Sequence, residues 1–423
     1  MTNQEMIDKL NQSISLQNEV IGSLSGNPNP AWPISDRIIR PKPTPLAIGP
    51  AGYQFTDPSF NTSLRRITDE SSSHGASCRV ASNAHLSAFN SDSSIFFVVD
   101  EGNTVIFYNT DGVKLPYTIP GYGEPCFSYL YSNGIFRAGG DNNRTILGID
   151  VTNGNITGQT NLDEKYPLSG EIYVGGVLVA DNDIWATFWG GPAQDEHNLI
   201  YHSSGKSTNT LQYIKPFKIH SIALDRTGRF VFIYVRQQDI ATVGKILIWD
   251  VPSNTFIPMF TPQNLPGGHD CIGYNEWITH DCCTSSDWDA MQWQYRTITD
   301  LMHTRDLINP ILTPKLVYAD DHTSYRNASA SGAKPIISST FRTVDGNNQP
   351  DTCPWRAWDD EIIGIMVNGT VYRYCHHQSL YTGDFWDQPL AHVSPDSKYV
   401  VFSSNWGQTL LNKRQDVFLA KII

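Results

Sequence analysis

The chain has 423 residues, of which 40% are hydrophobic and 11% aromatic, so it carries enough apolar surface to bury a large core. Lys and Arg number 30 against 42 Asp and Glu, and the resulting net charge of −12 argues against a nucleic-acid partner or a polybasic membrane-surface role. No run of about 18 apolar residues and no apolar signal-peptide core at residues 1–10 is present, so neither membrane insertion nor Sec export is expected.

Residues 1–26 predict an N-terminal α-helix. Its seam positions step by three and four along the chain, the spacing of a coiled coil, and they are Ile7, Leu10, Ile14, Gln17, Ile21 and Leu24. Such a helix buries its stripe either against copies of itself or against the rest of the chain, and the pattern favours neither. In the first case residues 7–24 form a homo-oligomer, and the N-terminus attaches the chain to a larger assembly.

Residues 27–54 are rich in proline and predict an extended linker. Prolines stand at positions 28, 30, 33, 41, 43, 45 and 50. Proline restricts the backbone to extended conformations, so a fairly stiff spacer is expected between the helix and the remaining chain.

Residues 55–423 read as short strand-forming segments separated by turns. Three stretches, beginning at His85, His220 and His392, share a histidine, a short strand, a polar turn and a β-branched or aromatic strand. Weaker copies begin near positions 126, 172, 269 and 322. Repeats of forty to fifty residues with several strands each are typical of a β-propeller, and seven starts predict an all-β, seven-bladed β-propeller. Residues 62–68 are expected to supply the outer strand missing from the last blade.

The histidines at the blade openings are the first candidates for chemistry. In a propeller the innermost strand of each blade lines the central channel, so His85, His220, His269 and His392 are expected near one rim. Neutral imidazole is a common metal ligand and can take a proton near neutral pH. The alternative is that each histidine binds a neighbouring blade and holds the repeats together.

The blade openings, the segment Gly268–Asp270 and the run from Gln388 to Trp406 resemble the TolB-like propellers and, among these, the oligogalacturonate lyases. The resemblance implies a divalent metal, Mn or Ca, on the channel rim. It implies that His269, Gln388 and His392 are the metal ligands. The family has a further histidine where this chain has Ser394, so one expected ligand is missing.

The same resemblance implies a β-elimination. His220 would be the base that takes the proton next to a uronate carboxylate, and Arg226 or Arg229 would be its charge partner. Trp288 and Trp293 lie in a polar stretch and could stack on sugars, and Glu276 lies in the histidine-rich and acidic stretch after Gly267, so these three are candidate substrate-binding residues.

Two functions fit these features. The helix and linker favour a glycan-directed propeller displayed as an oligomeric appendage on the outer surface of a virion or cell. The histidine-rich rim favours the alternative, a metal-dependent lyase that cleaves uronate-containing polysaccharides. With Ser394 in place of a ligand, the sequence slightly favours glycan binding without catalysis.

Overall fold

The computed structural model describes residues 33–423 apart from short gaps, which are 74, 122, 140–144, 162–172, 175, 191–196, 203–210, 216–218, 236–245, 260–269, 282–291, 308–318, 343–354, 356, 411 and 413. The predicted N-terminal helix therefore lies outside the described residues. Within the described part, no helix has the length and apolar character needed to cross a membrane.

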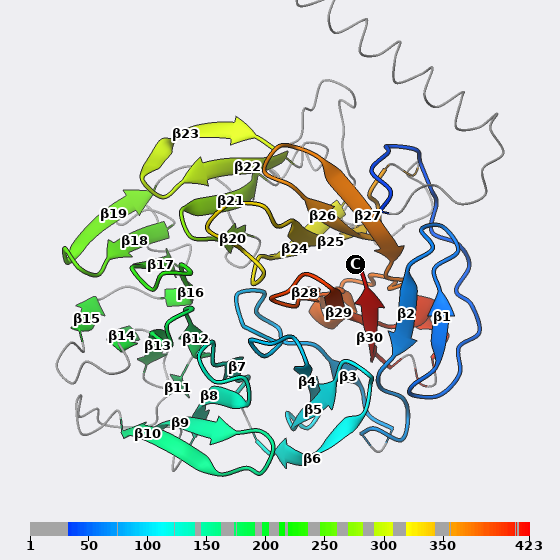
Figure 1. Ribbon diagram of the computed structural model, residues 1–423, viewed down its shortest axis with the longest axis horizontal. Helices are drawn as coiled ribbons and strands as arrows, with labels where there is room; N and C mark the ends of the chain where they lie inside the picture. Colours follow the sequence, from blue (N-terminus) through cyan, green and yellow to red (C-terminus); the bar gives the residue numbers. More distant parts are fainter. Residues whose placement is uncertain are drawn as a thin grey trace, which may run out of the picture.

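Six antiparallel sheets, each from one continuous stretch of chain, form blades 1 to 6 around a common centre (Figure 1). Blade 1 contains β3 (Cys78–Arg79), β4 (Ile95–Asp100), β5 (Val105–Asn109) and β6 (Lys114–Ile119). Blade 2 contains β7 (Cys126–Phe127), β8 (Gly134–Gly139), β9 (Thr145–Asp150) and β10 (Ile156–Asn161). Blade 3 contains β11 (Tyr173–Val174), β12 (Leu178–Val179), β13 (Trp185–Gly190), β14 (His197–His202) and β15 (Leu211–Lys215).

Blades 4 to 6 repeat the four-stranded arrangement. Blade 4 contains β16 (Ile219–Leu224), β17 (Phe230–Val235), β18 (Ile246–Asp250) and β19 (Thr255–Met259). Blade 5 contains β20 (Asp270–Ile272), β21 (Glu276–Asp281), β22 (Gln292–Thr297) and β23 (Asp300–Asp306). Blade 6 contains β24 (Ala319–Ser324), β25 (Ile336–Arg342), β26 (Glu361–Ile365) and β27 (Val371–His376).

A further, composite sheet closes the ring from both ends of the described chain. It joins β28 (His392–Val393), β29 (Tyr399–Ser404) and β30 (Asp416–Lys421) to β2 (Ser63–Arg66) and β1 (Gln54–Thr56). Strand β2 pairs with β30 from Ser63 opposite Lys421 to Arg66 opposite Phe418, as predicted for residues 62–68. The all-β propeller is thus confirmed. The structure has six blades built from continuous repeats rather than the predicted seven, and the strands predicted as the seventh blade belong to this composite sheet.

The core lies between neighbouring sheets. Strands β17 and β25 are buried along their whole length, because both faces of each sheet pack against the next one in the ring. This burial explains the uninterrupted apolar run Phe230–Val235 in place of an alternating pattern. Four cysteines, Cys78, Cys126, Cys271 and Cys375, are buried free thiols.

The described part of the proline-rich segment packs on the propeller instead of standing apart as a spacer. Ile34 forms a β-bridge with Arg373, and Trp406 Nε1 donates a hydrogen bond to the Leu46 carbonyl. The prediction of a separating linker is therefore corrected from residue 33 onward. The physical reason is that an extended backbone leaves its carbonyls available, and the Arg373 guanidinium of blade 6 donates a hydrogen bond to the carbonyl of Ile38.

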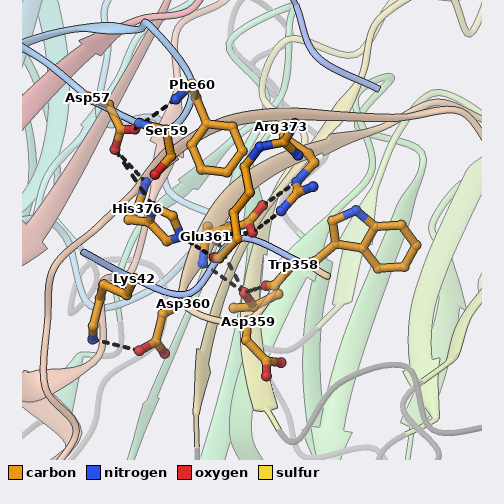
Figure 2. A network of polar contacts seen from close by, with 12 residues as sticks. Lys42, Asp57, Ser59, Phe60, Trp358, Asp359, Asp360, Glu361, Arg373 and His376 are labelled. Carbon is orange, nitrogen blue, oxygen red and sulfur yellow. Dashed lines mark hydrogen bonds and ion pairs between the residues drawn. The ribbon is translucent and has the colours of Figure 1, made fainter. Parts of the chain in front are cut away.

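The strongest of these contacts form a buried network of charges (Figure 2). The Arg373 guanidinium donates to both carboxylate oxygens of Glu361, at 2.8 and 2.5 Å, and also to Asp36 at 3.0 Å. Lys42 Nζ lies 2.6 Å from Asp360 Oδ2. The segment from Ile34 to Leu46, here called the strap, is thus held on blade 6 by ion pairs.

Candidate functional site

A cavity of about 430 Å³ opens at the end of the central channel where the inner strands begin. Its lining comes from blades 1, 3 and 4 and from the loops that lead into blade 2 and the closing sheet, and includes Arg79, Ser82, Asn83, Leu86, Glu124, Gly176, His220, Ser221, Phe385 and Trp386. A larger cavity, about 800 Å³, borders blade 2, and Asp150 is the sole acidic or basic side chain among its described lining residues. The candidate site for acid–base chemistry is therefore the cavity of about 430 Å³, here called the rim cavity.

His220 is the second residue of β16 and its side chain is exposed in the rim cavity. Its Nδ1 lies 3.3 Å from Ser221 Oγ. The position follows from the fold, because an inner strand that starts at the rim presents its first side chains to the channel mouth. An exposed imidazole in a cavity can accept a proton from a bound molecule. The structure therefore places His220 at the channel rim, as predicted.

A second histidine, His85, stands beside the same cavity and contacts a buried carboxylate. His85 Nε2 lies 3.3 Å from Asp270 Oδ1, and Leu86, the next residue, lines the cavity. Tyr234 and Trp277 both donate hydrogen bonds to the other oxygen of Asp270, the latter at 2.7 Å. Burial alone would raise the pKa of Asp270, but the hydrogen bonds that it accepts hold the pKa below its ordinary value. A carboxylate so fixed can orient the imidazole of His85.

An arginine and two aromatic rings complete the rim cavity. Arg79 is ion-paired with Glu124, whose carboxylate also accepts hydrogen bonds from the Ser82 backbone and hydroxyl. The Arg79 guanidinium lies over the ring of Trp386, 4.1 Å from its centroid. Trp386 and its neighbour Phe385 begin the short 3-10 helix η5 (Phe385–Asp387) and are 37% and 41% exposed. Exposed aromatic rings beside a charged group form a surface on which a sugar can stack.

The predicted metal ligands show no metal site among the described residues. Gln388 Oε1 lies 2.5 Å from His322 Nε2, and His392 Nε2 donates to the Ala81 carbonyl at 2.9 Å. Burial lowers the pKa of His392 below its ordinary value. His269 lies outside the described residues, and the described ones contain no group of three or more His, Cys, Asp or Glu side chains able to hold a metal ion. His392 instead connects the closing sheet to blade 1, as in the bracing alternative.

Other predicted site residues lie away from the rim cavity. Arg226 follows the far end of β16 and is fully buried, with Nη2 2.7 Å from Asp181 Oδ1. Glu276 is the first residue of β21, and its carboxylate accepts the backbone N–H of Tyr274 in the preceding turn at 3.0 Å. Trp293 is fully buried and donates to Asp321 at 2.9 Å, so it packs blades 5 and 6 together instead of offering a face to sugars. Trp288 lies outside the described residues.

These positions correct the expected pairing of His220 with Arg226. Strand β16 separates the two residues, and its rise of roughly 3.3 Å per residue places them toward opposite ends of the channel. The alternative partner, Arg229, is exposed and bound to Asp250 at 2.9 Å in blade 4. Arg79 is instead the guanidinium that shares the cavity with His220.

Comparison with solved structures agrees with the fold described above. The structure of an oligogalacturonate lyase from Vibrio parahaemolyticus superimposes with a TM-score of 0.56 at 10% identity, covering 90% of this chain and 99% of that one. A second oligogalacturonate lyase, in complex with manganese, gives a TM-score of 0.55 at 13% identity, covering 91% and 99%. The chain has an oligogalacturonate lyase-like propeller fold. No family model matches the sequence, and no curated protein does.

Several residues of the rim cavity carried no recognisable sequence signal. Arg79 and Glu124 lie in segments without a motif and meet only when blade 1 and the loop before blade 2 come together. Asp270 and Trp386 stand in the sequence close to the predicted ligands His269 and Gln388. The useful signal was the position of a cluster just before an inner strand, because such loops surround the channel mouth.

Proposed function

We propose that the chain is a polysaccharide lyase that cleaves uronate-containing glycans by β-elimination in the rim cavity. The observation that carries the proposal is the exposed His220 in a cavity at the mouth of a propeller whose structural neighbours are named oligogalacturonate lyases. Those names support the lyase better than the virion or cell-surface appendage. Glycan recognition is common to both functions.

The residues of the cavity divide the reaction between them. Arg79 pairs with the uronate carboxylate, and Trp386 stacks against the sugar ring. His220 takes the proton from the carbon next to the carboxylate, and the electron pair of that bond forms a carbon–carbon double bond as the glycosidic oxygen leaves. The departing oxygen takes a proton from water. The products are a shortened chain and a sugar with an unsaturated uronate at its end.

A divalent cation, Mn²⁺ or Ca²⁺, would assist the proposed reaction, but none of its steps is assigned to the cation. One neighbour is a manganese complex, and a bound cation would neutralise the uronate carboxylate and acidify the neighbouring proton. The described donors do not fit a metal by themselves, since Gln388 and His392 are engaged with His322 and Ala81. The proposed reaction therefore assigns its steps to the residues of the chain. Metal content of the purified protein tests this point.

The test replaces the base. His220→Ala should lower the rate of unsaturated uronate formation on polygalacturonate by about 10²- to 10⁴-fold, the usual contribution of a general base. The matched control is His303→Ala, which removes an imidazole that is 86% exposed on β23 and bound to Asp300. The His303→Ala variant should keep the wild-type rate. If the His220→Ala variant keeps the wild-type rate and an intact circular dichroism spectrum, the assignment of His220 as the base is refuted.

A further inference from the structure

The channel end opposite the rim cavity contains two buried arginines. Arg226 lies in the turn after β16, and Arg326 in the turn after β24. Arg326 reaches across the centre of the ring, where Nε donates to Ser87 Oγ of blade 1 and Nη2 to the Val179 carbonyl of blade 3, both at 2.7 Å. Arg226 packs its guanidinium over the ring of Tyr129, 4.5 Å from the centroid. Both side chains are buried.

The two guanidinium groups interact with one shared carboxylate. Asp181 Oδ1 lies 2.7 Å from Arg226 Nη2, and the charge of Asp181 also acts on Arg326. The carboxylates of Asp183 and Glu276 bind other groups: Asp183 accepts hydrogen bonds from Ser128 and Tyr129, and Glu276 accepts the backbone N–H of Tyr274. Among the described residues, Arg326 has no carboxylate within ion-pair distance and Arg226 has only Asp181, and a buried charge without a direct partner is costly.

The donors of Arg226 are also incompletely used. Although Nη2 forms the ion pair with Asp181, the atoms Nε, Nη1 and Nη2 lack a well-aligned hydrogen-bond acceptor among the described residues. Burial and the neighbouring charge of Arg226 lower the pKa of Arg326 to about 10, which still leaves Arg326 protonated at neutral pH. The unused donors of Arg226 and the positive charge of Arg326 would both be stabilised by an additional acceptor that carries a negative charge.

We propose that this end of the channel binds a small inorganic anion, of the size of chloride, between Arg226 and Arg326. The burial of both guanidinium groups favours a compact ion over a sugar carboxylate. The bound anion pairs with both guanidinium groups and supplies the missing acceptor for Arg226. The site is separate from the rim cavity and independent of the proposed lyase activity.

The experiment uses the full-length chain in gluconate buffer of constant ionic strength, into which chloride is titrated. Chloride should raise the unfolding temperature in a saturable manner, by roughly 2–5 °C. The rise should be lost in Arg226→Met and kept in Arg229→Met, which removes the same charge from an exposed arginine of the same turn. If Arg226→Met fails to fold, crystals of the wild type grown in bromide should show an anomalous peak between the two guanidinium groups.

Two results would overturn the proposal. The first is an unfolding temperature that does not respond to chloride, together with the absence of a bromide peak. The second is a response to galacturonate but not to chloride that disappears in Arg226→Met, because the arginines would then bind a substrate carboxylate. Neither result depends on whether the protein cleaves polygalacturonate.

Discussion

Replacing Arg373 by Met tests how the strap is held on the propeller. Arg373 donates to both oxygens of Glu361, and both side chains are fully buried. The substitution leaves a buried carboxylate without its counter-ion and also removes the hydrogen bond to Asp36. Breaking a buried ion pair by removing one partner costs about 3–5 kcal/mol of unfolding free energy. Urea unfolding followed by tryptophan fluorescence measures this loss.

The loss should depend on pH in a defined direction. Burial raises the pKa of Glu361 to about 7, although Arg373 opposes the shift, so removing Arg373 raises the pKa further. A carboxyl group whose pKa is raised on folding stabilises the protein below its unfolded pKa, and that contribution disappears as the pH rises through the folded value. The destabilisation should therefore be larger at pH 8.5 than at pH 5.5.

Two further variants make the result specific. The double variant Arg373→Met with Glu361→Gln removes the unpaired charge and should recover part of the lost stability. Arg229→Met removes an exposed ion pair with Asp250 and should leave the urea midpoint unchanged. A loss below about 1 kcal/mol for Arg373→Met, equal at both pH values, would show that the network does not hold the strap.

Three other predictions concern acid stability, substrate charge and assembly. Burial lowers the pKa of His377 to about 4, so its contribution to stability is present above pH 6.5 and is lost as the pH falls toward 4; it amounts to about 2 kcal/mol between pH 7 and 5. His377→Gln should weaken the dependence of the urea midpoint on pH over that range. Part of the dependence remains, because burial also lowers the pKa of His376, to about 3. An unchanged dependence on pH would contradict the assignment. Arg79→Gln should raise KM on polygalacturonate about tenfold but leave binding of a methyl-esterified polymer unchanged; equal effects on both would exclude Arg79 as the carboxylate partner. Removal of residues 1–26 should convert an oligomer to a monomer in light scattering, and an unchanged mass would refute the coiled-coil prediction.

The architecture was predictable from the sequence because its signals are local. A short sequence pattern marks the start of several inner strands, as at His220 and His392. The distance between successive patterns indicates a propeller. The closing strand could also be inferred, since the last repeat lacked a partner and residues 62–68 had strand character. Extended backbone for the proline-rich segment was equally readable.

The contacts of that segment and most of the site were not predictable, for two physical reasons. Composition describes the conformation of the strap but not the surface it binds, and its partners Asp360 and Arg373 come from more than 300 residues away. The pairing of His220 with Arg226 was wrong although the two residues are close in the sequence, because the extended strand β16 between them places them far apart in space. Arg79 illustrates the reverse case, a site residue brought to the cavity by a distant part of the chain.

The most direct test of the central claim is the mass of the products formed from polygalacturonate by the purified wild-type chain. A β-elimination gives fragments whose new ends are unsaturated, so their masses are lower by one water molecule than those of hydrolysis products. We expect these unsaturated fragments, and we expect His220→Ala to suppress them. Hydrolysis products, or an intact polymer after incubation with a set of uronate polysaccharides and added Mn²⁺ or Ca²⁺, would contradict the assignment of the rim cavity as a lyase site.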